Sequence, residues 1–153
     1  MNLSIPILLF IAALLANSVS AQTVDRKKLR HLKVSQAERE RLADRLAKFI
    51  ELEIKKDFET QFEMVPTNCP AYLYCWSGSK AEYVNYKMAS YRMYGELIEL
   101  KLGKVEGRLK DNCVGIPLSP KLKDGKKIYF NASASVACIK NGEWYLAFSY
   151  VEI

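Results

Sequence analysis

The chain has 153 residues, of which 50% are apolar and 26% are charged, and its formal net charge is +6. This length and composition fit one globular domain and exclude an intrinsically disordered chain. The sequence contains a single histidine, which leaves little room for the imidazole-based catalysis that many hydrolases use.

Residues 1–21 are predicted to be a cleavable signal peptide. An uncharged apolar run from Ile5 to Ala16 is followed by a short polar stretch, with Val19 and Ala21 at the small-residue positions of a cleavage site. The run is shorter than the about 20 residues that a membrane-spanning helix needs, which disfavours the alternative of a retained anchor. We therefore expect a secreted protein (periplasmic in a bacterium) with no membrane span in the mature chain.

Residues 22–34 are polar and basic, and they are expected to form a flexible arm before a single domain of residues 35–153. The domain opens with a capping box, in which Ser35 and Glu38 satisfy each other's backbone amides. Apolar residues at helical spacing then predict one long helix, with a kink or break, that stops before Pro66.

A short aromatic strand over 72–76 is predicted next, and a second capping box at Ser79 and Glu82 begins a second helix. Gly95 is a suitable end for this helix. Its buried face is expected to carry four residues: Ala81, Val84, Met88 and Tyr91.

After residue 96 the apolar period changes to two, which predicts antiparallel strands with turns at Asp124-Gly125 and Asn141-Gly142. Pro117 and Pro120 interrupt the pattern. The predicted fold class is therefore α+β, with a long N-terminal helix and a second helix packed on a curved antiparallel sheet of about four to five strands.

A two-residue turn at Asn141-Gly142 fixes the register of the last hairpin, so that Lys140 faces Glu143. One face of this hairpin is small and apolar, and suits packing against a helix or cavity. The other face is too apolar for solvent, and we expect either a homodimer partner or the N-terminal arm to cover it. This expected partner face carries Trp144, Leu146, Phe148 and Tyr150.

Four cysteines follow the signal peptide, and an even number in an oxidising compartment predicts two disulfides. Their spacing does not fit a zinc site, and no metal or cofactor is expected. The strand register places Cys113 diagonal to Cys138, which favours Cys113–Cys138 and leaves Cys69–Cys75 as a local bridge. A crossed connectivity remains open.

The element order of residues 35–153 and the ending Lys140-Asn141-Gly142-Glu143-Trp144-Tyr145-Leu146-Ala147 resemble the nuclear-transport-factor-2-like superfamily. This resemblance implies a cone of helices on a curved antiparallel sheet, a pocket between the two, and frequent dimers through the sheet. It implies functions from isomerases to binding modules, and does not select among them. The cystatin fold is the runner-up, although its inhibitory Gln-x-Val-x-Gly loop is absent here.

One catalytic mechanism remains possible, which is general acid–base catalysis by a carboxylate and a tyrosine, as in isomerases of that superfamily. Asp111 is the candidate, because its strand register points it inward beside Val105 and Leu109, and the alternative is a solvated carboxylate at a strand end. The only histidine, His31, lies in the basic arm and is a poor catalytic base.

Our preferred interpretation is a secreted, non-catalytic domain that binds an extracytoplasmic partner or a small apolar ligand, with no nucleic acid expected. A small isomerase or hydratase is the first alternative, and a binder of anionic polysaccharide or lipid headgroups is the second. The candidate ligand pocket is aromatic, with Tyr72, Tyr74, Trp76, Tyr91 and Tyr94. The candidate basic patch comprises Lys27, Lys28, Lys123, Lys126 and Lys127.

Overall fold

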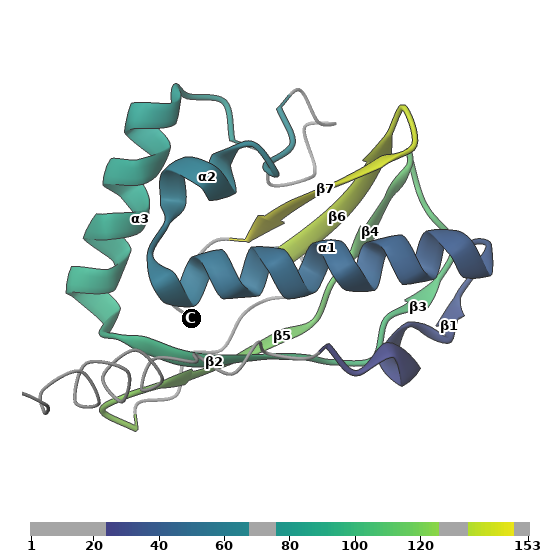
Figure 1. Cartoon of the computed structure of the whole chain (residues 1–153), viewed down its shortest axis with the longest axis horizontal. Helices are drawn as coiled ribbons and strands as arrows, with labels where there is room; N and C mark the ends of the chain where they lie inside the picture. Colours follow the sequence, from purple (N-terminus) through teal and green to yellow (C-terminus); the bar gives the residue numbers. More distant parts are fainter. Residues whose placement is uncertain (1–23, 68–75, 126–134, 149–153) are drawn as a thin grey trace, which may run out of the picture.

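The computed structural model describes residues 24–67, 76–125 and 135–148. The predicted signal peptide, residues 72–75 of the predicted aromatic strand over 72–76, and the pair Cys69 and Cys75 lie outside these ranges. Within them, helices pack on antiparallel sheets, so the fold is α+β as predicted (Figure 1).

Helix α1 (Gln36–Lys55) begins at the predicted capping box. The Ser35 hydroxyl accepts from the Glu38 amide at 3.2 Å, and the Glu38 carboxylate accepts from the Ser35 amide at the same distance. The predicted break also exists, because Lys56 adopts a left-handed conformation with a φ of 60°. Helix α2 (Phe58–Phe62) then begins after Asp57, whose side chain caps the helix by accepting a hydrogen bond from the Thr60 amide. The buried stripe of α1 includes Leu42, Leu46, Phe49 and Ile50.

Helix α3 (Lys80–Tyr94) also has the predicted capping box, and it ends at Gly95, whose amide donates to the Tyr91 carbonyl at 2.9 Å. Its predicted buried face is wrong at two positions, because Ala81 and Met88 are exposed. The residues that α3 buries are Tyr83, Lys87, Ser90 and Tyr91. The buried face of α3 therefore includes a lysine, which the prediction did not contain.

Two antiparallel sheets pack against α1, which runs across their strands (Figure 1). The first pairs β2 (Leu97–Leu102) with β5 (Leu118–Leu122), and the second has the order β4-β6-β7, with β4 at Cys113–Gly115, β6 at Ser135–Lys140 and β7 at Glu143–Phe148. Only Ile116 and Pro117 separate β4 from β5, so one bent segment runs through both sheets. Pro120 does not interrupt this segment, and it lies opposite Leu100 in the ladder.

The β6–β7 hairpin has the predicted register, with Lys140 opposite Glu143. The assignment of its faces was wrong, however. Trp144, Leu146 and Phe148 are at most 4% exposed and belong to the main core, packed beneath α1. The Trp144 indole donates to the Glu38 carbonyl of α1 at 3.2 Å. The large apolar face is therefore covered by the chain's own helix rather than by a partner, and Tyr150 lies outside the described residues.

The N-terminal segment is not a flexible arm. It forms a 3-10 helix, η2 (Arg26–Leu29), and a short strand, β1 (His31–Leu32), which pairs in parallel with β3 (Glu106–Gly107). Leu29 and Leu32 are each 1% exposed, so the segment is held by two leucines that reach the core between its basic residues. The domain therefore begins before residue 35.

Candidate functional site

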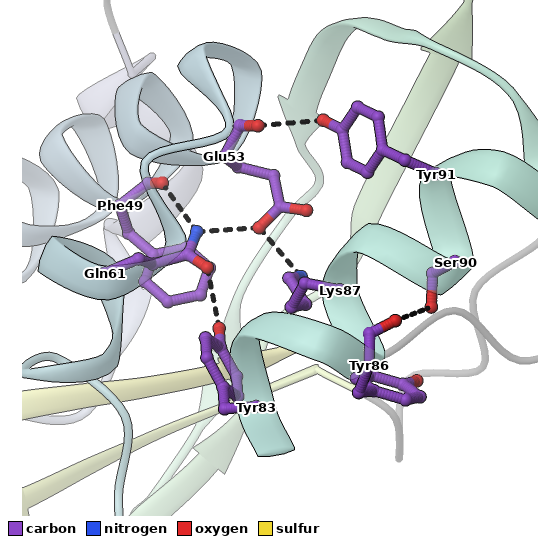
Figure 2. Close-up of polar contacts among 8 residues, drawn as sticks. All are labelled: Phe49, Glu53, Gln61, Tyr83, Tyr86, Lys87, Ser90 and Tyr91. Atoms are coloured by element: carbon purple, nitrogen blue, oxygen red, sulfur yellow. Dashed lines mark hydrogen bonds and ion pairs between the residues drawn. The ribbon is translucent and has the colours of Figure 1, made fainter. Parts of the chain in front are cut away.

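A cluster of buried polar side chains joins the three helices (Figure 2). We define this central polar cluster as Glu53 from α1, Gln61 from α2, and Tyr83, Lys87 and Tyr91 from α3. At its centre the Lys87 ammonium lies 2.8 Å from the Glu53 carboxylate, and both side chains are completely buried. A buried charge is costly unless it is paired, and here each ion neutralises the other.

Gln61 connects the ion pair to the rest of the cluster. Its side-chain amide donates to the Glu53 carboxylate at 2.6 Å and to the Phe49 carbonyl at 3.2 Å. Its carbonyl oxygen accepts from the Tyr83 hydroxyl at 2.6 Å. The Tyr91 hydroxyl donates to the backbone carbonyl of Glu53 at 2.8 Å, which ties α3 to the end of α1.

Aromatic rings enclose the Lys87 ammonium. Its nitrogen lies 4.1 Å from the centre of the Phe148 ring, 5.6 Å from that of Phe58 and 5.9 Å from that of Tyr83. Ring faces attract cations, and the attraction is stronger away from water. Because Phe148 is on β7, the cluster joins the helices to the sheet as well as to one another.

Burial has opposite effects on the two titratable groups of α3. It lowers the pKa of the Lys87 ammonium, although the Glu53 carboxylate acts in the other direction. It raises the pKa of the Tyr83 phenol, and the charge of Glu53 adds to this effect, so Tyr83 remains a hydrogen-bond donor. The cluster has the residues of an acid–base site, but it is sealed from solvent, and its geometry suits positioning of the helices.

A concave surface lies at the turn end of the β6–β7 hairpin, whereas Phe148, which contacts Lys87, is at the other end of β7. We call it the hairpin cleft; it has a volume of about 410 Å³. Its lining includes Thr67, the turn residues Asp111 and Asn112, and Asn141 and Tyr145 of the β6–β7 hairpin. Its full lining is Pro66, Thr67, Asp111, Asn112, Cys113, Cys138, Ile139, Lys140, Asn141 and Tyr145.

The predicted Cys113–Cys138 disulfide is present and lines the cleft, with an S–S distance of 2.11 Å. The two cysteines are directly opposite each other in the β4–β6 ladder, whereas the sequence placed them on a diagonal. Tyr145 opposes Cys138 across the hairpin, so it shares their face of the sheet. This face is turned away from Trp144 and Leu146, which pack against α1.

The candidate catalytic residue does not point inward. Asp111 is exposed and adopts a φ of 51°, and with Asn112 at 62° it forms a tight turn instead of the expected strand. The enclosed carboxylate that the isomerase hypothesis required is therefore absent at this position. His31 is also exposed, and its Nε2 accepts from the Arg30 guanidinium at 2.8 Å.

The three aromatic candidates in the described ranges, Trp76, Tyr91 and Tyr94, lie in different surroundings. Tyr91 is in the core against Phe58. Trp76 packs on Tyr83 and Tyr86, with ring centres 5.4 Å apart in both pairs. Tyr94 is half-buried, and Tyr72 and Tyr74 lie outside the described residues.

The three described lysines of the candidate basic patch do not share one surface. Lys27 and Lys28 lie on η2, whereas Lys123 follows β5 at the other end of the domain (Figure 1). Lys123 also lies 3.3 Å from Glu96. Lys126 and Lys127 are outside the described residues.

In the described ranges we find no group of three or more His, Cys, Asp or Glu side chains that could hold a metal ion. No helix in the same ranges is both long and apolar enough to cross a membrane. Comparison with protein-family models and with curated proteins found no match to this chain.

Proposed function

We propose that this chain is a secreted, non-catalytic binding domain, and that the hairpin cleft holds its ligand. The observation that carries the proposal is the cleft itself. Its volume of about 410 Å³ lies within the range of small-molecule sites, which is roughly 300–1,000 Å³. Such sites combine an apolar surface with a few polar groups that orient the ligand.

The lining indicates a small polar ligand rather than the apolar one expected from the sequence. Asp111 and Lys140 supply one charge of each sign, and Asn112 and Asn141 supply amides that both donate and accept hydrogen bonds. Tyr145 adds a ring with a polar tip. This mixture suits a neutral compound that carries hydroxyl or amide groups, such as a short saccharide or peptide.

Secretion is supported by two independent features. The Cys113–Cys138 bridge is of the kind that forms and persists in oxidising compartments. The sequence of residues 1–21 has the pattern of a cleavable signal peptide.

The absence of catalysis is supported by where the acid–base groups lie. Glu53 and Lys87 are sealed in the core, and Asp111 is solvated at a turn. The proposed relationship to the nuclear-transport-factor-2-like superfamily agrees with the helix-on-sheet arrangement. In the described part of the chain, the central polar cluster occupies the interior between the three helices and Phe148 of the sheet.

The test is a titration of the isotope-labelled, secreted protein followed by two-dimensional NMR. The probes are a panel of mono- and disaccharides and of N-acetylated dipeptide amides. We expect the backbone signals of Asp111, Asn112, Asn141 and Tyr145 to shift with at least one probe. Tyr145→Ala should abolish the shifts, and Tyr94→Ala, a half-buried tyrosine away from the cleft, should not. Shifts that cluster elsewhere, or none with any probe, would overturn the proposal.

A further inference from the structure

A second concave surface lies between η2 and the first turns of α1, and it is lined by three arginines. We call it the arginine hollow; it is formed by Arg26, Arg30 and Arg39 with Gln36 and Glu40, and its volume is about 240 Å³. Arg26 and Arg30 belong to the basic segment 22–34, whereas Arg39 lies outside it, on α1. The docking of η2 against α1 brings them together.

The guanidinium of Arg39 is fixed in place by the backbone. Its Nη1 donates to the Val34 carbonyl at 2.8 Å and to the Leu32 carbonyl at 3.2 Å. Arg30 uses its Nε to donate to His31 at 2.8 Å. These contacts occupy only part of the five N–H groups that each guanidinium carries. The hollow is therefore lined by positioned donors.

The charge balance of the hollow is positive. Three arginines line it, and the single carboxylate in the lining, Glu40, accepts a hydrogen bond from Gln36 at 3.0 Å. Arg26 pairs with Asp44 at 2.6 Å, but both side chains are more than half exposed. Such a surface pair contributes little free energy, so an incoming anion can replace it at little cost.

We propose that the arginine hollow binds a sulfate group of a sulfated polysaccharide. Guanidinium groups match oxyanions in geometry, because two parallel N–H groups can reach two oxygens at once. Lys27, Lys28 and Lys33 are exposed on the same segment and provide charge for neighbouring sulfates. The proposal rests on the secretion proposed above but does not involve the hairpin cleft. Either of the two binding sites can therefore be disproved without affecting the other.

An anionic membrane surface and a single-stranded nucleic acid fit these observations less well than a sulfated polysaccharide does. Binding in a membrane interface uses apolar side chains, and the exposed large apolar residues in the described part are Met88, Met93 and Ile98, on α3 and β2. Single-stranded nucleic acid stacks its bases on aromatic rings, and residues 24–45 contain no Phe, Tyr or Trp. Residues 24–45 therefore offer charge without an apolar anchor or a stacking platform.

The experiment measures the affinity of the secreted protein for a fluorescent heparin oligosaccharide at about 0.15 M salt. The test variant is Arg26→Gln with Arg30→Gln. Its control is Arg92→Gln with Lys121→Gln, which removes the same charge from exposed positions on α3 and β5. We expect the dissociation constant to rise about tenfold or more for the test variant and less than about twofold for the control.

Arg39→Lys keeps the net charge and removes the planar guanidinium, and it should weaken binding severalfold. Equal losses in the test and control variants would show diffuse charge attraction and overturn the proposal. Desulfated oligosaccharide should not bind. Phosphatidylcholine vesicles with about a quarter phosphatidylserine, and a single-stranded oligonucleotide, should bind more weakly than heparin. Tighter binding of either one, lost in the test variant, would also overturn it.

Discussion

The Lys87 ammonium on α3 lies 2.8 Å from the Glu53 carboxylate on α1, and neither side chain is exposed. This pair occupies the position where two amphipathic helices ordinarily place apolar side chains. A buried pair of this kind does not guarantee high stability, since removing two ions from water is costly. It does restrict how the helices can pack, because a shift of either helix would separate the ions and leave each charge buried without its partner.

Removing one partner of this pair should destabilise the protein strongly. Lys87→Ala leaves the Glu53 carboxylate buried with no cation beside it, and we expect the free energy of unfolding to fall by about 3–5 kcal/mol. Urea unfolding followed by circular dichroism measures this loss. Lys80→Ala is the matched control on the same helix, because the Lys80–Glu63 pair is exposed and should be worth less than about 1 kcal/mol. Equal losses would contradict the structural role of Lys87.

Replacing both ions should restore much of that stability. Glu53→Leu with Lys87→Met fills a similar volume with apolar atoms and removes both desolvation costs, so this double variant should be clearly more stable than Lys87→Ala. Gln61 loses one hydrogen-bond partner but keeps its bond to the Phe49 carbonyl. If the double variant is as unstable as the single one, packing rather than charge is responsible.

Stability should rise with pH through the titration of Lys87. The ordinary pKa of lysine is 10.5, and burial lowers it in the folded protein. Between the two pKa values the unfolded chain holds a proton that the folded chain has released, so the free energy of unfolding increases with pH.

The increase should be on the order of 1 kcal/mol per pH unit inside that window. Lys87→Met should lack it, and urea unfolding of both proteins from neutral pH to about pH 10 compares the slopes. The raised pKa of Tyr83 acts in the opposite direction, but only above the ordinary tyrosine value of 10.0. Parallel slopes in the two proteins would show that Lys87 keeps its proton throughout.

The Cys113–Cys138 bridge closes a loop with a sequence separation of 25 residues. Loop-closure entropy predicts that Cys113→Ala with Cys138→Ala lowers the free energy of unfolding by about 3–4 kcal/mol. Urea unfolding again provides the measurement, and the NMR signals of the hairpin cleft should broaden at Asp111 and Asn112. An unchanged unfolding midpoint would mean that the strand pairing alone holds this edge.

The turn at Asp111-Asn112 places two non-glycine residues at positive φ. Glycine adopts this conformation without the steric cost that other residues pay, so Asn112→Gly should raise the free energy of unfolding by about 1 kcal/mol. Gly142→Ala is the inverse control, since Gly142 has a φ of 79° and open space around it, and it should lose a similar amount. Thermal unfolding of the two variants should therefore shift in opposite directions.

The covered hairpin face leads to a prediction about oligomeric state. Leu146 is 2% exposed and belongs to the core beneath α1, so Leu146→Ala should cost about 2–5 kcal/mol. Light scattering should report the same molar mass for the variant and the wild type under conditions in which both are folded. A change in mass without a change in stability would instead favour the partner face expected from the sequence.

The features that local interactions determine were predicted well. The capping boxes at Ser35 and Ser79, the end of α3 at Gly95 and the register across Asn141-Gly142 depend on residues only a few positions apart. The Cys113–Cys138 pairing was predicted from that register together with a turn at Asp124-Gly125. The observed β4–β6 ladder is shifted by two residues, so that the cysteines are directly opposite rather than diagonal.

The features that depend on distant contacts were missed. Lys87 was absent from the predicted buried face of α3, because its partner Glu53 is on another helix. Its spacing from Tyr83 and Tyr91, at four residues from each, was the signal that it shares their buried face. The two faces of the last hairpin were both apolar, so pattern alone could not decide which one α1 would cover. In the N-terminal segment, Leu29 and Leu32 indicated packing against the core. The basic residues around them favoured the interpretation as a flexible arm instead.

The hairpin cleft is bordered by two tight turns, and the strands between them are joined by a disulfide. A surface built in this way has few conformations to lose when a ligand arrives, so most of the contact energy would appear as affinity. The same cross-link that joins β4 to β6 would thus also prepare this edge of the sheet for recognition of a ligand.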